Sequence, residues 1–290
     1  MFDGRVTVVV ATCNRRADLL RTLPEHEAPV IVVDNGSTDG TAEAVRQCRP
    51  DVDFIALGHN VGAVARNVGV SRAGSPYVAF ADDDSYWEPG SLDKAATLLD
   101  QHERAALLCG RVLVGTDARL DPTSVEMAAA PLGWAPDLPG PIILGFLACA
   151  AIVRREAFLQ VGGFAPMLHV YGEEQLLAWD LSAAGWGLAY VEDIVARHLP
   201  SRSRVSRSER RRREVRNRLL TAWLRRPPAR AVAVTAHALR RAISDPDEGA
   251  GALAAAARLP TVLRHRRRIP DQLEHSIRML ELRSASWTSG

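Results

Sequence analysis

Short apolar runs alternate with amphipathic stretches through the first 84 residues. The runs that are apolar at nearly every position predict strands at 6–11, 30–33, 54–57 and 77–81. The stretches between them predict helices at 16–23, 41–47 and 63–70. Strands that are apolar throughout, and that alternate with helices, are typical of a parallel sheet covered on both faces. We therefore predict an α/β fold, built as a Rossmann-like, doubly wound α/β/α sandwich.

The pattern loosens after residue 85. Further predicted helices are 92–99, 155–161 and 173–184, and further predicted strands are 107–114 and 188–191. The proline-rich stretch 116–141 is a candidate lid or acceptor loop, because long irregular segments in compact domains are often functional. From Pro200 the chain is arginine-rich and mainly helical, with breaks expected at 227–228, 245–251 and Pro270. We predict a catalytic domain at 1–199 and a basic helical C-terminal region at 200–290.

Polar residues follow each of the four early strands. Thr12 and Asn14 come after the first strand, and Asp34 closes the second. Asn60 follows the third strand, and the aspartate run 82–84 closes the fourth. One such residue is usually a helix cap, but parallel sheets bind ligands at the carboxyl ends of their strands. Polar residues at four neighbouring strand ends predict a ligand site there.

The run Asp82-Asp83-Asp84 crowds three carboxylates at the end of a buried strand. Like charges held this close disfavour one another's ionised form, so a fold tolerates them mainly where a cation compensates. Oxygen ligands in an Asp-x-Asp spacing suit Mg²⁺ or Mn²⁺, which commonly bridge to phosphate oxygens. The alternative is a solvated acidic turn that caps the following helix.

The charge is divided between two parts of the chain. Residues 199–290 hold 21 of the 36 basic residues and 8 of the 34 acidic ones, a net charge of +13 against −11 for residues 1–198. Within and after the arginine run 202–218, apolar residues recur at helical spacing: Val215, Leu219, Leu220, Trp223 and Leu224. Such a helix can lie on anionic lipid, bind an acidic acceptor or polyphosphate, or dock on the acidic body. We favour docking, with some phosphate or membrane contact.

Other partners and compartments follow from what is missing in the sequence. No recognition motif accompanies the basic charge, so we expect no nucleic-acid partner, while the helical region could pair two copies as a homodimer. The longest apolar stretch, 142–153, falls short of the roughly 20 residues of a membrane span. No signal-peptide pattern opens the chain, and the four cysteines are widely spaced, which favours free thiols. We expect a cytoplasmic protein, with peripheral contact on the inner membrane face as an alternative.

Four sequence blocks in a fixed order resemble the bacterial family 2 glycosyltransferases. They are 8–15 (VVVATCNR), 32–41 (VVDNGSTDGT), 60–67 (NVGAVARN) and 80–84 (FADDD). The resemblance extends over about residues 5–198. It implies a GT-A fold, a nucleotide-sugar donor, a divalent cation, Mn²⁺ or Mg²⁺, and transfer of the sugar to an acceptor hydroxyl with inversion at the anomeric carbon.

The resemblance also assigns roles to individual residues. It implies that Thr12, Asn14 and Asp34 hold the nucleobase. Asp82 would face the ribose and share the metal with Asp84, which grips the diphosphate through it. The remaining residues placed with the nucleotide-sugar site are Asn60, Arg66 and Asp83. Arg66 has a structural alternative, an ion pair on a helix face.

The catalytic base is expected at the start of the predicted helix 173–184. Relatives usually show Glu-Asp there, so the resemblance puts the base at Glu174 with Glu173 as its neighbour, and leaves open which of the two acts. One ionised carboxylate within reach of the acceptor hydroxyl is enough. Two glutamates are also favoured at a helix N-terminus by the helix dipole. His198 stands where many relatives carry a histidine, sometimes a further metal ligand, although a lone histidine is often structural.

Two other functions remain as alternatives. A sugar-1-phosphate nucleotidyltransferase would share the α/β build and the metal, but residues 12–15 lack the glycines of its phosphate loop. A non-catalytic nucleotide-binding module with a basic interaction tail would not need Asp82, Asp84 and Glu174. The donor sugar, its base and the acceptor, whether glycan, lipid-linked or natural product, are not encoded in any motif.

Overall fold

A computed structural model describes residues 4–201 and 205–287 of the chain. A single nine-stranded sheet forms its centre, in the order β3-β2-β1-β4-β8-β6-β9-β5, with β7 paired to β6. The strands are β1 (Val6–Thr12), β2 (Val30–Asp34), β3 (Asp53–Ala56), β4 (Tyr77–Asp82), β5 (Ser85–Trp87), β6 (Ala105–Val114), β7 (Arg119–Leu120), β8 (Ala151–Arg154) and β9 (Gly187–His198). The four strands predicted first are all present and mutually parallel where they pair.

The sheet as a whole is mixed rather than parallel. β8 runs antiparallel to both β4 and β6, and β5 runs antiparallel to β9. Doubly wound folds commonly carry such strands on an otherwise parallel sheet. The parallel part sets the register that matters for the site, because β1 pairs Thr12 with Asp34 on one side and Ala11 with Asp82 on the other.

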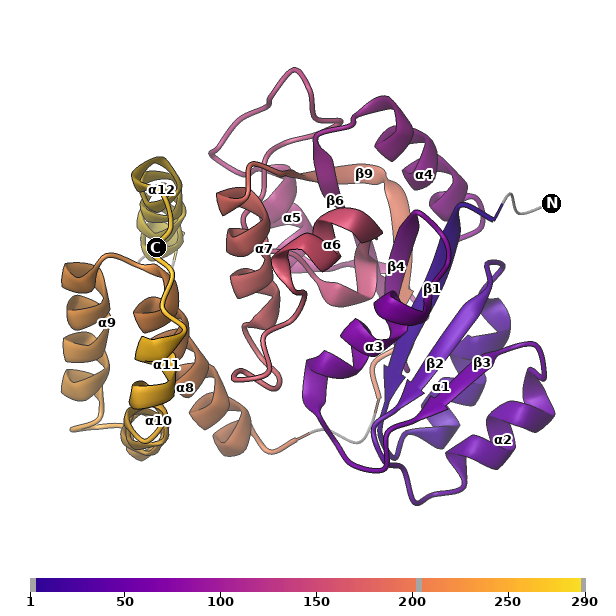
Figure 1. Ribbon diagram of the computed structural model, residues 1–290, viewed down its shortest axis with the longest axis horizontal. Coiled ribbons are helices and arrows are strands. Elements are labelled where there is room, and N and C mark those ends of the chain that lie inside the picture. The colour runs from indigo at the N-terminus through magenta and orange to yellow at the C-terminus, as the bar shows by residue number, and fades with distance from the viewer. Residues whose placement is uncertain (1–3, 202–204, 288–290) are drawn as a thin grey trace.

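Helices cover the sheet and then form a separate group at the end of the chain (Figure 1). Those of the first part are α1 (Arg16–Thr22), α2 (Thr41–Cys48), α3 (Ala65–Arg72), α4 (Ser91–Gln101), α5 (Pro122–Ala128), α6 (Arg155–Val161) and α7 (Glu173–Ala183). Those of the C-terminal part are α8 (Arg207–Arg225), α9 (Pro228–Arg241), α10 (Pro246–Ala256), α11 (Leu259–Arg264) and α12 (Asp271–Trp287). Short 3₁₀ turns are Leu23–Glu25, Gly62–Val64 and Ala148–Ala150.

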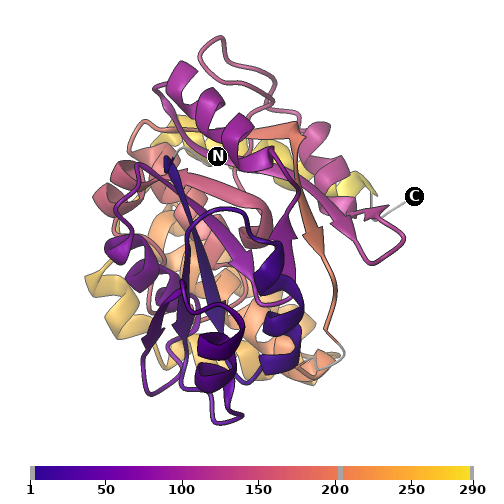
Figure 2. The same cartoon turned by 90° about the vertical axis from the view of Figure 1, so that its right-hand side faces the viewer.

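Two hydrophobic clusters hold these parts together. The larger one fills the sheet and its helices, and includes a triad of aromatic rings, Phe80, Phe158 and Phe164, with centroids 5.6–5.7 Å apart. The smaller one joins α8–α11 to Leu168 and Leu176 of the first part. The chain then returns, because Ile269 just before α12 and residues of α12 itself belong to the larger cluster. Figure 2 shows the C-terminal helices lying behind the sheet.

Several sequence-based expectations need correction. The stretch 116–141 contains a helix, α5, which Asp121 caps by accepting a hydrogen bond from the Thr123 amide. β9 is much longer than the expected 188–191, because it continues past a bulge, so His198 ends the strand. The expected break at 245–251 is wrong, since Asp245 and Pro246 begin α10 instead, as an N-cap and an N1 proline do.

Two further expectations concern the basic region and the membrane. Arg202 and Arg204, part of the expected basic helix, lie outside the described residues. Among the residues that the structure describes, no helix has both the length and the apolar character needed to cross a membrane.

Candidate functional site

Strand ends bring Thr12, Asp34 and Asp82 to one edge of the sheet. β1 is the centre of this arrangement, since it pairs with both β2 and β4. Asn35, which the sequence reasoning did not single out, ties the edge to the next segment of chain. Its amide donates to the Thr12 carbonyl at 2.8 Å, and its buried side chain bonds the Gly62 carbonyl at 3.2 Å and the Val61 amide at 3.0 Å.

The candidate nucleobase residues are held by the loop after β2. Asn14 adopts a left-handed backbone with φ 53°; its amide donates to Ser37 Oγ at 2.8 Å, and its Oδ1 accepts from the Thr38 amide at 2.8 Å. Buried Asp34 accepts from the Ser37 amide at 3.1 and 3.2 Å. These bonds fix the shape of the loop and leave Asn14 exposed at its rim. Asn60 lies beside it, with its Nδ2 3.3 Å from Cys13 Sγ.

Arg66 on α3 is buried and forms an ion pair with Asp82. Its guanidinium lies 5.8 Å from the centre of the Phe164 ring, and its Nε has no hydrogen-bond partner. Burial disfavours the charged guanidinium, but Asp82, Glu173 and Glu174 outweigh it and raise the pKa of Arg66. The arrangement is therefore a buried cation among three carboxylates rather than a surface ion pair.

The three aspartates of the run point to different partners. Asp83 accepts from Thr12 Oγ1 at 3.1 Å, and burial, with Asp82 and Asp84 nearby, raises its pKa to about 7. Asp84 Oδ1 lies 3.4 Å from His198 Nε2, and its Oδ2 accepts from the Ser201 amide at 3.0 Å. Burial acts to raise the pKa of Asp84, but the hydrogen bond with His198 outweighs burial and lowers it. The same bond raises the pKa of His198. Register places the two together, because Ser85 of β5 pairs with His198.

A divalent cation fits the pair Asp84 and His198 as an open site. In the described ranges, no group of three acidic, histidine or cysteine side chains stands ready to enclose an ion, and Asp82 is engaged by Arg66. Mg²⁺ is usually held by one or two protein ligands, with water and substrate phosphates completing the shell. One carboxylate and one imidazole facing each other supply such a partial shell, and Mn²⁺ accepts both donors.

Glu173 and Glu174 open α7, directly after Gly172, whose φ is 89°. Glu173 is 4% exposed and its Oε2 has no hydrogen-bond partner, whereas Glu174 is half-buried. Burial, followed by the charge of Glu174, raises the pKa of Glu173 to about 8. Burial also raises the pKa of Glu174, which its hydrogen bond with Glu173 and the charge of Arg66 partly offset. Of the two carboxyl groups, Glu173 is the more deeply buried by exposed surface, and both have raised pKa values.

The loop that leads into this glutamate pair is held from two sides. On one side, the Ala63 amide donates to the His169 carbonyl at 2.8 Å, and Gly62 leaves no room for a side chain, because a Cβ there would lie 2.5 Å from that carbonyl oxygen. On the other side, Asn217 of α8 is 1% exposed. Its Nδ2 lies 2.8, 2.8 and 2.7 Å from the carbonyl oxygens of Leu168, Val170 and Tyr171.

Asn217 is the residue that sequence reasoning missed most clearly. It lies in an arginine-rich region whose sequence pattern indicates only charge and helical spacing, yet it bonds a backbone segment nearly fifty positions earlier in the chain. His169 and Tyr171 both have left-handed backbones, with φ 66° and 75°, a conformation that side chains other than glycine adopt at a cost. The three carbonyl contacts of Asn217 stabilise this unfavourable segment.

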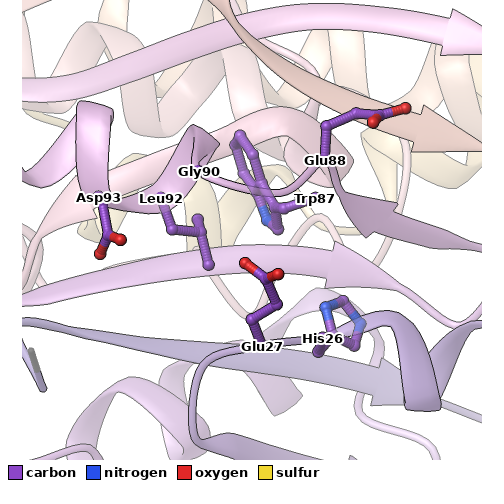
Figure 3. A pocket seen from close by; sticks show the side chains of 7 residues that line it. All are labelled: His26, Glu27, Trp87, Glu88, Gly90, Leu92 and Asp93. Atoms are coloured by element: carbon purple, nitrogen blue, oxygen red, sulfur yellow. The ribbon is translucent and has the colours of Figure 1, made fainter. Parts of the chain in front are cut away.

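A small pocket lies apart from the strand-end residues. Figure 3 shows His26, Glu27, Trp87 and Glu88 among its lining side chains. None of the candidate site residues lines it. Burial, followed by the charge of Arg49, lowers the pKa of His26 to about 4, so this histidine is a neutral interior group.

Comparison with known proteins gives one family. The model of the family described as Glycosyl transferase family 2 matches residues 7–162, more than half of the chain. An N-acetylglucosaminyl-diphospho-decaprenol L-rhamnosyltransferase of Mycobacterium tuberculosis is 30% identical over 207 residues, which cover 60% of this chain and 67% of that protein.

Solved structures show the same fold. TarS 1–349 of Staphylococcus aureus in complex with UDP-GlcNAc superposes with a TM-score of 0.59 at 17% identity, over 94% of this chain and 83% of that one. The mannosyltransferase PcManGT of Pyrobaculum calidifontis, in complex with GDP-Man and Mn²⁺, gives a TM-score of 0.57 at 23% identity, over 90% and 73%. The expected α/β fold class, a GT-A type sandwich with a helical C-terminal part, is confirmed.

Proposed function

Since the chain belongs to glycosyl transferase family 2, we propose that it is a metal-dependent, inverting glycosyltransferase. It is a glycosyltransferase with a nucleotide-sugar donor. The proposal adds the cation, the stereochemistry and the residues that act. One observation carries it. The glutamate pair that opens α7 lies close enough to Arg66 and Asp82 at the strand ends for their charges to shift one another's pKa.

The donor occupies the carboxyl ends of β1, β2 and β4 in this proposal. Thr12, Asn14 and Asp34 face the nucleobase. The rest of the nucleotide sugar meets Asn60, Arg66, Asp82 and Asp83. The buried guanidinium of Arg66 presents positive charge to the sugar and the diphosphate. Asp82 orients this guanidinium and itself faces the ribose. Support comes from the register that sets Thr12 beside Asp34 and from the burial of the ion pair.

Asp84 and His198 hold the cation, with Asp82 as a further oxygen ligand when it turns from Arg66. When bound, Mn²⁺ or Mg²⁺ neutralises charge that builds on the departing nucleoside diphosphate. The Ser201 amide fixes Asp84 Oδ2 at 3.0 Å, which keeps Oδ1 directed to His198. The protein thus holds one oxygen ligand and one nitrogen ligand for the cation in place before the nucleotide sugar binds.

Glu174 acts as the general base. The acceptor hydroxyl oxygen forms a bond to the anomeric carbon from the face opposite the diphosphate, and the bond from that carbon to the diphosphate oxygen breaks. The leaving oxygen keeps the electron pair, and the acceptor proton goes to the Glu174 carboxylate. Burial and the charge of Glu174 raise the pKa of Glu173 to about 8, so we assign proton acceptance to Glu174 and a supporting position to Glu173.

The proposal also covers the chain as a whole. We place the catalytic part at 1–199 and the helical part at 200–290, in a cytoplasmic protein. A nucleotidyltransferase would transfer a nucleotide rather than a sugar, and a non-catalytic module would show no turnover.

Turnover of a donor panel tests the proposal. The protein is incubated with UDP-, GDP- and dTDP-sugars in Mn²⁺ or Mg²⁺, and release of the nucleoside diphosphate by transfer of the sugar to water is measured with and without a chelator. We expect release from one donor class, lost with the chelator and lost in Asp84→Asn, while Asp117→Asn, an exposed aspartate on the turn before β7, is unaffected. Release that persists in chelator would refute metal dependence, and a nucleotidyl transfer product would favour the alternative enzyme.

A further inference from the structure

Large apolar side chains are exposed on the outer side of the C-terminal helices. α9 and α10 lie at the left of Figure 1, away from the sheet. Four apolar side chains of these helices and of the turn after α9 expose 54–89% of their surface: Val232, Leu239, Ile243 and Leu253. We call these four side chains the outer apolar face.

Helical spacing and a shared hollow join the four side chains into one surface. Leu239 and Leu253 both line an open hollow of about 380 Å³, whose walls come from α8, α9, α10 and α11. Val232 precedes Leu239 by seven positions and Ile243 follows it by four, so all three lie on one side of α9 and its last turn. A contiguous apolar surface of this kind marks a contact with another molecule or with a membrane.

The segment that carries the outer apolar face offers no free carboxylate. Residues 228–264, which the structure describes throughout, include three acidic residues, Asp245, Asp247 and Glu248. All three stand at the start of α10 and are engaged within the protein. Asp245 caps the helix, Asp247 pairs with Arg212 of α8, and Glu248 is fully buried.

Unneutralised positive charge lies beside the apolar side chains. In the described part of the chain, three exposed arginines of this segment pair with no carboxylate: Arg240, Arg258 and Arg264. Arg240 directly follows Leu239, and Arg258 directly precedes Leu259, which also lines the hollow. Exposed apolar side chains next to arginines are the pattern of helices that lie in a lipid interface.

The apolar residues of α8 do not contribute to this surface. Their spacing in the sequence predicts an amphipathic helix that could lie on lipid, but in the structure most of them are 0–3% exposed: Val215, Leu219, Leu220 and Leu224. They form the interior of the smaller hydrophobic cluster instead. The surface available for an external contact is therefore that of α9 and α10.

We propose that the outer apolar face docks the protein on an anionic lipid surface. The apolar side chains enter the boundary between headgroups and acyl chains, and the three unpaired arginines meet the lipid phosphates. A second copy of the chain fits the face less well, because a two-fold contact would bring the same unpaired arginines together. The proposal concerns where the protein lies and does not rest on the proposed reaction.

Vesicle flotation tests the assignment on the full 290-residue chain. Vesicles of phosphatidylcholine alone are compared with vesicles of equal parts phosphatidylcholine and phosphatidylglycerol. We expect at least 10-fold tighter binding to the mixed vesicles, and weaker binding at high salt, because salt screens the arginine–phosphate attraction. Equal affinity for the two kinds of vesicle, or no binding to either, would overturn the proposal.

A matched pair of leucine variants tests the apolar part. Leu253→Glu should weaken binding to the mixed vesicles at least 10-fold, because the side chain then no longer gains from leaving water. Leu159→Glu, the same change at a 41% exposed leucine of α6, should leave binding unchanged. Both positions are exposed, and circular dichroism confirms that both variants fold. Equal binding by the two variants would refute this surface.

A second pair of variants tests the charge. Arg240→Gln should weaken binding to the mixed vesicles about 5-fold, whereas Arg119→Gln, an exposed arginine of β7, should have no effect. Equal effects of the two variants would contradict a local role of the arginines.

Sedimentation distinguishes a second copy from a membrane. If the wild type is a dimer that Leu253→Glu dissociates, and vesicle binding survives in that variant, the face joins two copies and the proposal is refuted. Release of nucleoside diphosphate should be the same in all four variants as in the wild type. Its absence from the wild type would count against the proposed function, while the flotation result would stand.

Discussion

The strand-end half of the molecule and its C-terminal helices bury charged side chains in different arrangements. At the strand ends, Arg66 is one buried cation surrounded by Asp82, Glu173 and Glu174. In the helices a fully buried anion, Glu248, receives three arginines, and the buried cation Arg226 pairs with Glu274 and Glu281. The comparison shows that a net charge of +13 overstates the free positive charge of the C-terminal region, because much of it is matched internally.

The two halves meet at the loop before α7. α3 and the Gly62 turn contact this loop from the donor side, and α8 contacts it through Asn217 and Arg216. The basic region is expected to dock on the acidic body, and α8 does pack there. Its side chains bind backbone carbonyl groups of the loop as well as a carboxylate. Arg225 provides the ionic contact, with Asp180 of α7 as its partner.

The largest effect is expected at the base. Glu174→Gln keeps the shape of the side chain and removes its ability to take a proton, so sugar transfer should fall by about 10²–10⁴-fold. Nucleotide binding should stay within a factor of three of wild type. Single-turnover transfer and calorimetry measure the two quantities. If transfer is unchanged in Glu174→Gln but collapses in Glu173→Gln, the base is Glu173.

The buried anion of the helices should dominate the stability of its own region. Glu248→Gln leaves Arg211, Arg218 and Arg241 around an uncharged group, and the free energy of unfolding should fall by about 3 kcal/mol. Glu214→Gln is the matched control, because the exposed pair Arg210–Glu214 should contribute less than about 0.5 kcal/mol. Urea denaturation measures both. Equal effects in the two variants would contradict the contrast between buried and exposed pairs.

Asn217 tests whether the helices position the base. Asn217→Ala leaves the carbonyls of Val170 and Tyr171 without their side-chain donor, while Leu168 keeps Arg216, and the change should cost about 2 kcal/mol of stability. Because the loop then holds α7 less firmly, kcat should fall about 10-fold while the KM for the donor is unchanged. Gln101→Ala, an exposed carboxamide at the end of α4, is the control. A loss of stability with full kcat below the melting transition would make Asn217 purely structural.

The pattern of apolar and polar residues predicted the elements that depend mainly on local sequence. β1, β2 and β4 are apolar at almost every position, and α7 begins where two glutamates follow a glycine. The long β9 was missed because Glu192 and Asp193 interrupt its apolar pattern at the bulge. Partners far apart in sequence could not be foretold from composition either. The bonds of Asn217 to residues 168–171 and of Glu248 to Arg211 depend on how α8 packs, which no spacing encodes.

Thermal melting with nucleotides tests the central claim, a metal-assisted donor site at the strand ends, most directly. The protein is melted with UDP, GDP or dTDP, each with and without Mn²⁺, at about 100 times the dissociation constant. Binding to the native state should then add about 2.7 kcal/mol, a rise in Tm of about 5 °C for a chain of this size. We predict that rise for one nucleotide, only with Mn²⁺, and not in Asp84→Asn. No rise with any of the three nucleotides in the presence of metal would contradict the account.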